Sequence, residues 1–128
     1  MNSYREFWPF YVSQHQQPGT RLLHFIGTTG AILCVVAAIA AQTWWLLLLA
    51  PVAGYGPAWL AHLFVERNRP ATFTHPLWSL IGDFHMYGLM WLGRMDGEIA
   101  RLNEARADRA VVGRGRAGRS SGRGGRRR

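Results

Sequence analysis

A run of 44 residues without Asp, Glu, Lys or Arg constrains the fold of this 128-residue chain most strongly; it extends from Leu22 to Val65. A helix that crosses a bilayer needs roughly 20 apolar residues, so the run predicts two crossings joined by a tight turn. The segment AAQTWW, residues 40–45, is the predicted turn, because two Trp suited to a membrane interface follow the polar Gln42 and Thr43. The alternative, a soluble protein with a buried hairpin, would need covering helices that the rest of the chain does not offer.

The segments around this hairpin predict further helices. The capping-box pattern SYRE at Ser3 opens an aromatic-rich interfacial helix that extends to about Gln16 and bends near Pro9. The two spans are expected at about 20–41 and 44–65, and the second should be kinked or loosened by its prolines and glycines (Pro51, Gly54, Gly56 and Pro57). A third long helix, at about 76–93, contains Asp83 and His85, so it either crosses the membrane or lies along the interface. The predicted fold class is therefore an all-α membrane protein built on a transmembrane helical hairpin.

Charge is distributed unevenly along the chain. Of the formal net charge of +8, most belongs to the last 16 residues, which hold seven Arg and no acid, whereas residues 1–112 hold eight Arg and seven acids. We expect a single helical membrane domain over 1–112, ending in a short amphipathic helix at 96–110, and a disordered Arg/Gly-rich tail over 113–128. Since Arg flanks only the open end of the hairpin, both termini are predicted on the cytoplasmic side of the membrane.

Histidines gather at one depth of this predicted hairpin. His24 lies about 18 residues before the turn and His62 about 19 after it, which places both roughly 28 Å from the turn, at the cytoplasmic edge. His15 precedes the break at Pro18-Gly19 and His75 follows the break at Pro70, so each could fold back to that edge. Glu66 lies four residues after His62, on the same helix face. The pattern predicts a divalent metal site, with iron, zinc, manganese and copper as candidates.

Other interpretations of these side chains remain open. A lone interfacial His often only extends its ring toward water, and Glu66 would also pair with Arg21, Arg67 or Arg69. His85 has no partner at matching depth and is expected to be structural. The single cysteine, Cys34, excludes an internal disulfide and a Cys-based zinc site.

Two motifs in order resemble a known family. FWPFYVSQHQQPGTRLLHFIGTT contains Y-x3-H and P-x2-R-x2-H-x2-G, and HLFVERNRPA contains H-x3-E-x2-R-P-A. Over about 7–93 the chain resembles the small membrane proteins whose characterised member is the fungal endoplasmic-reticulum 2-hydroxy fatty acid dioxygenase, and it is similar to short bacterial-type members. The Arg-rich tail lies outside this pattern.

The resemblance implies a chemistry and a set of site residues. It implies an Fe(II)-dependent dioxygenase that converts a long-chain 2-hydroxy fatty acid and O2 into the acid one carbon shorter, with membrane lipid as surroundings and no nucleic-acid partner. The implied metal ligands are His15, His24 and His62, with His75 as a further candidate. The remaining predicted site residues are polar and charged: Arg21 or Arg69 to hold the carboxylate, and Asp83 or Glu66 to orient the histidines.

Two other functions fit the same sequence. One is a non-catalytic membrane protein whose Arg tail binds anionic lipid or nucleic acid, because Arg near an anionic surface contributes about 1 kcal/mol each. The other is a zinc-dependent membrane hydrolase. Metal analysis distinguishes them, since the three functions predict iron, no metal or zinc.

Overall fold

The computed structural model describes residues 1–121, and these are helical with no strand among them. The all-α prediction is confirmed to this extent. The chain divides into a compact unit over Met1–Met95 and a second unit that begins at Asp96. In chain order the helices are α1 (Tyr4–Ser13), α2 (Pro18–Ala40), α3 (Leu46–Ala61), the π-helical η1 (His62–Glu66), the 3-10 turn η2 (Ala71–Phe73), α4 (Pro76–Trp91) and α5 (Met95–Ser121).

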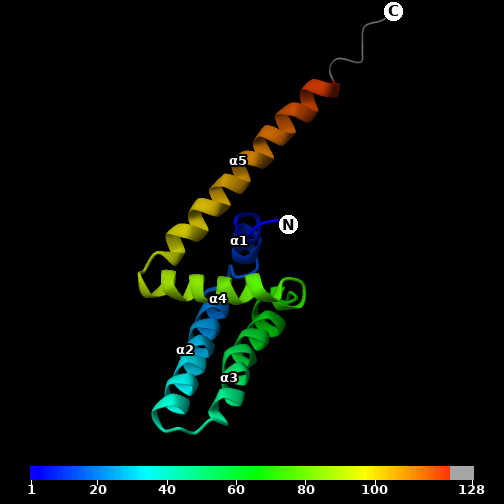
Figure 1. Ribbon diagram of the computed structural model, residues 1–128. Coiled ribbons are helices and arrows are strands. Elements are labelled where there is room, and N and C mark those ends of the chain that lie inside the picture. Colours follow the sequence, from blue (N-terminus) through cyan, green and yellow to red (C-terminus); the bar gives the residue numbers. More distant parts are fainter. Residues whose placement is uncertain (122–128) are drawn as a thin grey trace, which may run out of the picture. The chain divides into compact units, whose positions relative to one another are not determined.

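The centre of the first unit is an antiparallel hairpin of α2 and α3, which lie side by side in Figure 1. Both Pro18–Ala40 and the continuous segment Leu46–Glu66 are long and apolar enough to cross a membrane. The loop at 41–45 joins them, close to the predicted turn, and Gln42 adopts a positive φ of 50° there. The hairpin and its turn are therefore where the uncharged run predicted them.

Small residues let the two long helices approach closely. A Cβ added to Gly27 would lie 2.6 Å from the backbone oxygen of Gly54, and one added to Gly54 would touch the side chain of Ala31. Close backbone contact through glycine is how helices pack tightly when both are apolar. Gly27 follows His24 by less than one turn, so this contact also brings the histidine-bearing part of α2 against α3.

The irregularity in the second long helix lies at its end and not in its middle. The sequence predicted a kink or loosening near Pro51 and Pro57; α3 stays α-helical through both, so its middle is not loosened, and the kink stays a prediction. The chain instead widens into the π-helical turn His62–Glu66 and stops at Arg67, whose φ of 56° is left-handed. Short π-helical turns are frequent at functional sites, and this one begins at a predicted metal ligand.

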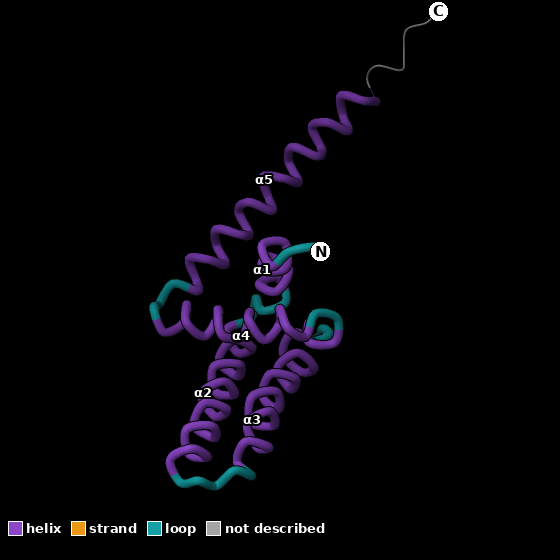
Figure 2. Tube along the Cα trace, in the orientation of Figure 1, coloured by secondary structure: helices purple, strands orange, loops and turns teal. Residues whose placement is uncertain are grey.

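The helices α1 and α4 cover the open end of the hairpin. Figure 1 shows α4 lying across this end, and Figure 2 shows the loops before α2 and after η1 near it. Hydrogen bonds from Gln17 to Glu66 and from Asn68 to Gln14 join these two segments. Helix α4 has 16 residues and is not among the described helices long enough to span. It was predicted either to cross the membrane or to lie along the interface, and its position across the end of the hairpin favours the interface. A Cβ on Gly82 would lie 2.9 Å from the Tyr11 ring, so this glycine lets α4 pack directly on α1.

Helix α1 is anchored by its cap and by aromatic packing. The Ser3 hydroxyl accepts a hydrogen bond from the Glu6 amide, and the Glu6 carboxylate accepts one from the Asn2 amide. The first bond is half of the predicted capping box, whereas the second reaches one residue further back. Pro9 lies inside the helix, and Phe7 and Tyr11 are fully buried.

The second unit consists of α5 and the residues after it. Sequence predicted a short helix at 96–110 and disorder from 113, but α5 is continuous from Met95 to Ser121. Ala and Arg are strong helix formers, which offsets the glycines in this segment. An exposed ion pair between Arg101 and Glu98 supports its first turns. Residues 122–128 of the predicted tail lie outside the described residues, and the division at 112 stays a prediction.

Candidate metal centre

Three of the five histidines meet at the open end of the hairpin. His15, His24 and His62 each present one ring nitrogen, and these nitrogens all lie within 4.8 Å of one another. The three residues, called the triad below, come from the loop after α1, the second turn of α2 and the first residue of η1. The Nε2 atoms of His15 and His24 are 3.1 Å apart, and the ring planes stand nearly perpendicular to each other. The convergence predicted from hairpin depth is present.

Each triad ring is oriented by a hydrogen bond at its outer nitrogen. His15 Nδ1 lies 2.6 Å from the Tyr11 carbonyl oxygen, and His24 Nδ1 lies 2.8 Å from the Thr20 carbonyl oxygen. His62 Nδ1 lies 2.6 Å from the Asn68 side-chain oxygen. A carbonyl oxygen only accepts, so each Nδ1 carries the proton.

The orientation of the Asn68 amide is determined by its second contact. Its nitrogen donates to the Gln14 carbonyl oxygen at 3.3 Å, which leaves the amide oxygen facing His62. Asn68 can make both bonds because the chain turns sharply at Arg67 and the Asn68 amide itself donates to the His62 carbonyl at 2.9 Å. Asn68 therefore connects the end of η1 to the His62 ring and to the end of α1 at Gln14.

The consequence is that the triad directs Nε2 lone pairs toward a common point. Two such nitrogens 3.1 Å apart repel each other unless a cation or proton lies between them. Imidazole ligands held 2.0–2.1 Å from one tetrahedral ion are roughly 3.3 Å apart, so the spacing suits a bound metal. A ligating histidine that donates its other N–H to a carbonyl or amide oxygen is also the usual arrangement in metal proteins. By donor chemistry and geometry, the residues fit a divalent transition metal.

Burial keeps the triad in the neutral form that binds metal. The side chains of His15, His24 and His62 are only 1%, 5% and 2% exposed. Burial, and then the neighbouring His24 and His62, lower the pKa of His15 well below its ordinary value, against the opposing effect of its bond to the Tyr11 carbonyl. Protons therefore compete weakly for His15, as metal binding requires.

Arg21 shapes the loop that presents His15. Its guanidinium donates to the carbonyl oxygens of His15 and Gln16 at 2.9 and 2.8 Å and is buried. These bonds satisfy carbonyls at the end of α1 and fold the loop back over α2. In this structure the Arg21 guanidinium supports the backbone beside His15, and its predicted part, with Arg69 as the alternative, in holding a carboxylate stays a prediction.

Two of the other predicted residues lie outside the triad. His75 is the cap residue just before α4, and its ring stacks on Trp78 with 5.3 Å between centroids. It is therefore not one of the converging histidines. Glu66 accepts a hydrogen bond from the Gln17 amide at 2.6 Å and thereby supports the start of α2. The role predicted for Glu66, orienting a histidine, is performed in the structure by Asn68.

Asp83 and Arg69 complete the predicted set. Asp83 accepts a 2.6 Å hydrogen bond from the Tyr11 hydroxyl, and the Tyr11 ring stacks on His15 with centroids 4.0 Å apart, so Asp83 reaches the triad through one intervening side chain. Burial raises the pKa of Asp83 to about 6, although the Tyr11 bond acts in the opposite direction. Arg69 is exposed and lies over the Phe73 ring.

Sequence reasoning missed three residues of this site. They are Asn68, Tyr11 and Thr20; the hydroxyl of Thr20 is fully buried and has no hydrogen-bond partner among the described residues. Tyr11 and Thr20 each stand four residues before a triad histidine, the spacing at which a helical carbonyl faces a later side chain. That spacing was a usable signal, whereas nothing in the sequence paired Asn68 with His62.

The fold and the triad define a class of small all-α proteins with a buried three-histidine centre at the end of an apolar hairpin. The model of one family, described as 2-hydroxy-palmitic acid dioxygenase Mpo1-like, matches residues 1–95. The chain belongs to this family, which confirms the resemblance, and the match ends where the first compact unit ends. No curated protein and no solved structure gives a match to the chain.

Proposed function

We propose that this protein is an Fe(II)-dependent dioxygenase of the membrane that shortens long-chain 2-hydroxy fatty acids by one carbon. The observation that carries the proposal is the triad, in which three buried imidazoles with oriented Nδ1–H groups direct Nε2 atoms to one point. The family description supplies the reaction class and the substrate class. His15, His24 and His62 would hold the metal.

The reaction balances without any other cofactor. The 2-hydroxy acid and one O2 give the acid one carbon shorter, CO2 and one water, and O2 takes up the four electrons that the substrate loses. Bound Fe(II) would supply the redox chemistry that lets O2 react with the substrate. Three protein ligands leave coordination positions for small oxygen ligands, as in other open metal sites.

The chain's own residues would orient the triad and surround the substrate. Carbonyls of Tyr11 and Thr20 and the amide of Asn68 keep the rings in one tautomer. The buried Thr20 hydroxyl is available for a substrate oxygen. Arg69, which lies exposed just after η1, remains the cation that we assign to the incoming carboxylate.

A membrane setting is part of the proposal. The most apolar windows of the two long helices are only 22% buried, which is low for core helices of a soluble protein. Large apolar side chains instead point outward along them, among them Leu22, Leu33, Leu48 and Val52. With both termini cytoplasmic, the triad would lie at the cytoplasmic edge of the inner membrane, where the head of a fatty acid meets water.

The test is the reaction itself with a metal control. Protein purified anaerobically is analysed for metal, loaded with Fe(II), and supplied with O2 and 2-hydroxypalmitate; mass spectrometry should detect the acid one carbon shorter and loss of the substrate. The same protein loaded with Zn2+ should yield none. Unchanged substrate across several chain lengths with iron fully loaded would contradict the proposal.

A zinc-dependent hydrolase is the second candidate. The specific observation in its favour is the ligand set, because three histidines without a carboxylate also form catalytic zinc sites. Zinc in the anaerobically purified protein, together with hydrolysis of lipid esters or amides, would favour this candidate over the dioxygenase. Protein that binds neither metal would instead favour the non-catalytic interpretation.

A further inference from the structure

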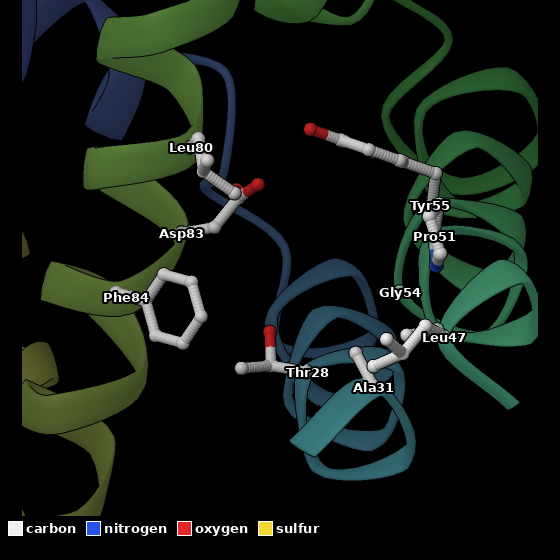
Figure 3. A pocket seen from close by; sticks show the side chains of 10 residues that line it. Thr28, Ala31, Leu47, Pro51, Gly54, Tyr55, Leu80, Asp83 and Phe84 are labelled. Carbon is white, nitrogen blue, oxygen red and sulfur yellow. The ribbon is translucent and has the colours of Figure 1, made fainter. Parts of the chain in front are cut away.

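A cavity of about 380 Å³ lies between α2, α3 and α4 in the first unit. Its size falls within the roughly 300–1,000 Å³ of small-molecule sites. Figure 3 shows side chains of all three helices around it, with the Asp83 carboxyl and the Tyr55 hydroxyl reaching in from opposite sides. The triad histidines do not line it, so the cavity is a separate feature of the molecule.

The cavity is polar at one end and apolar at the other. Tyr55 and Leu47 line it from α3 and precede His62 by seven and fifteen residues, or roughly 10 and 22 Å along the helix axis. Thr28 follows His24 by one turn on α2 and also lines the cavity. The end with hydroxyl groups is therefore the one nearer the triad, and the apolar end points toward the 41–45 loop.

The polar end is connected to the triad by direct contacts. Asp83 lines the cavity and accepts the 2.6 Å hydrogen bond of Tyr11, whose ring stacks on His15. A carboxylate at Asp83 would repel the carboxylate of a fatty acid, so the acid group is not expected to stop at this end of the cavity. It would lie beyond it, toward the triad, with the hydrocarbon chain behind.

We propose that this cavity binds the hydrocarbon chain of the fatty acid substrate and that Ala31 and Leu47 determine which chain lengths are accepted. The proposal rests on the proposed function for the identity of the substrate, while the binding of a chain by the cavity stands on the polarity and position just described. Ala31 lines the cavity from α2 and Leu47 lines it from α3, on the side away from Asp83 in Figure 3.

The occupant follows from the shape and polarity of the site. A single-chain amphiphile has one polar end and a long apolar remainder, which matches a cavity that is polar only toward the triad. The surrounding hairpin is apolar on its outside as well, so the chain would enter from lipid without passing through water. Because lipid tails are as apolar as the lining of the cavity, the cavity would select among chains by the space that it offers and not by burial from water.

The experiment measures chain-length preference in two ways on the full chain in lipid nanodiscs. The iron-loaded protein is given a series of saturated 2-hydroxy acids from medium to very long chains. The metal-free protein is given ordinary fatty acids of the same lengths, in competition with a fluorescent fatty acid. Ala31→Phe fills the cavity, Leu47→Ala extends it, and Ala37→Phe makes the first change on the lipid-exposed side of the same helix.

We expect Ala31→Phe to shift the preferred chain length to shorter acids in both measurements, because the added ring occupies space that the longer chains need. Leu47→Ala should shift it to longer chains, and Ala37→Phe should match the parent. Metal content should be unchanged in all three variants, because none of these side chains touches the triad.

The outcomes separate the cavity from the proposed function. If the parent oxidises the acids but Ala31→Phe and Leu47→Ala keep its chain-length profile, the cavity proposal is overturned and the function stands. If no acid is oxidised but binding to the metal-free protein shifts as expected, the cavity proposal is supported and the function fails. If Ala31→Phe loses metal, Leu47→Ala decides alone: a longer preferred chain supports the proposal and an unchanged one overturns it.

Discussion

The five histidines of this chain occupy two regions that treat the same side chain differently. In the triad, each ring is buried and its Nδ1 bonds an oxygen, so Nε2 faces its partners. In the aromatic cluster, formed by His75 and His85 with Phe7, Trp8 and Trp78, the rings stack instead. His85 lies 3.8 Å from Trp8 between centroids and contacts the Tyr4 hydroxyl at 2.9 Å.

The difference shows what makes a histidine a ligand in this molecule. A ring whose outer nitrogen is bonded to a carbonyl offers a lone pair in one direction, whereas a stacked ring uses its faces for packing. Residue type is identical in both regions, and each region contains one histidine inside an α-helix, His24 or His85, and one in a loop, His15 or His75. The group that contacts the outer nitrogen of the ring therefore determines whether a histidine can act as a metal ligand.

The largest effect should come from removing a triad ring. His24→Ala or His62→Ala takes away one of three ligands, so we expect metal stoichiometry near zero. The activity loss should exceed the roughly 10–100-fold that is typical when a residue that only hydrogen-bonds a ligand is removed. His85→Ala, the matched change in the aromatic cluster, should keep its metal. Elemental analysis of the purified variants provides the measurement, and full metal in both triad variants would refute the division into two regions.

Removing the partner of a triad ring should have the next largest effect. Asn68→Ala leaves the His62 ring free to rotate and change tautomer, so metal affinity should fall roughly 10–100-fold. Asn68→Asp retains an acceptor at Nδ1 and should recover most of it. Glu66→Gln should bind like the parent, because Glu66 bonds the Gln17 amide and not a histidine. Competition with a metal chelator measures all three, and equal losses in Glu66→Gln and Asn68→Ala would argue against the assignment.

Asp83 bonds Tyr11, whose ring stacks on His15, and its contribution to folding stability should depend on pH. Burial raises the pKa of its carboxyl from 3.8 to about 6 in the folded protein. The folded chain then holds a proton that the unfolded chain has released, so this group's contribution to stability decreases as pH rises from 3.8 to about 6. In Asp83→Asn this decrease should disappear, while the amide oxygen still accepts the Tyr11 bond.

The measurement is the thermal midpoint of parent and Asp83→Asn in detergent across this pH range. Taking the difference between the two proteins removes the contributions of the groups that both contain. We expect the variant to gain stability relative to the parent as pH rises through the range and the difference to level off above it. A difference that does not change with pH would mean that Asp83 is not held in a desolvated position.

The smallest effect should come from the aromatic cluster itself. His85→Phe keeps the stacking on Trp8 and loses the hydrogen bond with Tyr4, so the free energy of unfolding should fall by less than about 1.5 kcal/mol. Metal affinity should match the parent. Denaturant titration and the chelator competition above measure the two quantities, and a clear loss of metal affinity would place His85 among the ligands after all.

Much of this molecule follows from its sequence. The uncharged run from Leu22 to Val65 predicted two long apolar helices and a turn, because it is about twice as long as the roughly 20 apolar residues that one spanning helix needs. Equal distances from that turn then place His24 and His62 at one depth, since helical rise per residue is constant. The two motifs were enough to identify the family that residues 1–95 match.

Only the tertiary structure showed which groups orient the triad histidines and that His75 lies apart from the triad. Sequence spacing paired His62 with Glu66 because residues four apart share the face of an α-helix, but the chain is π-helical there and then turns left-handed at Arg67. That change of winding turns Glu66 toward Gln17 and brings Asn68 back to His62. Local spacing predicts neighbours only while the helix keeps its regular geometry, and this site forms where that geometry ends.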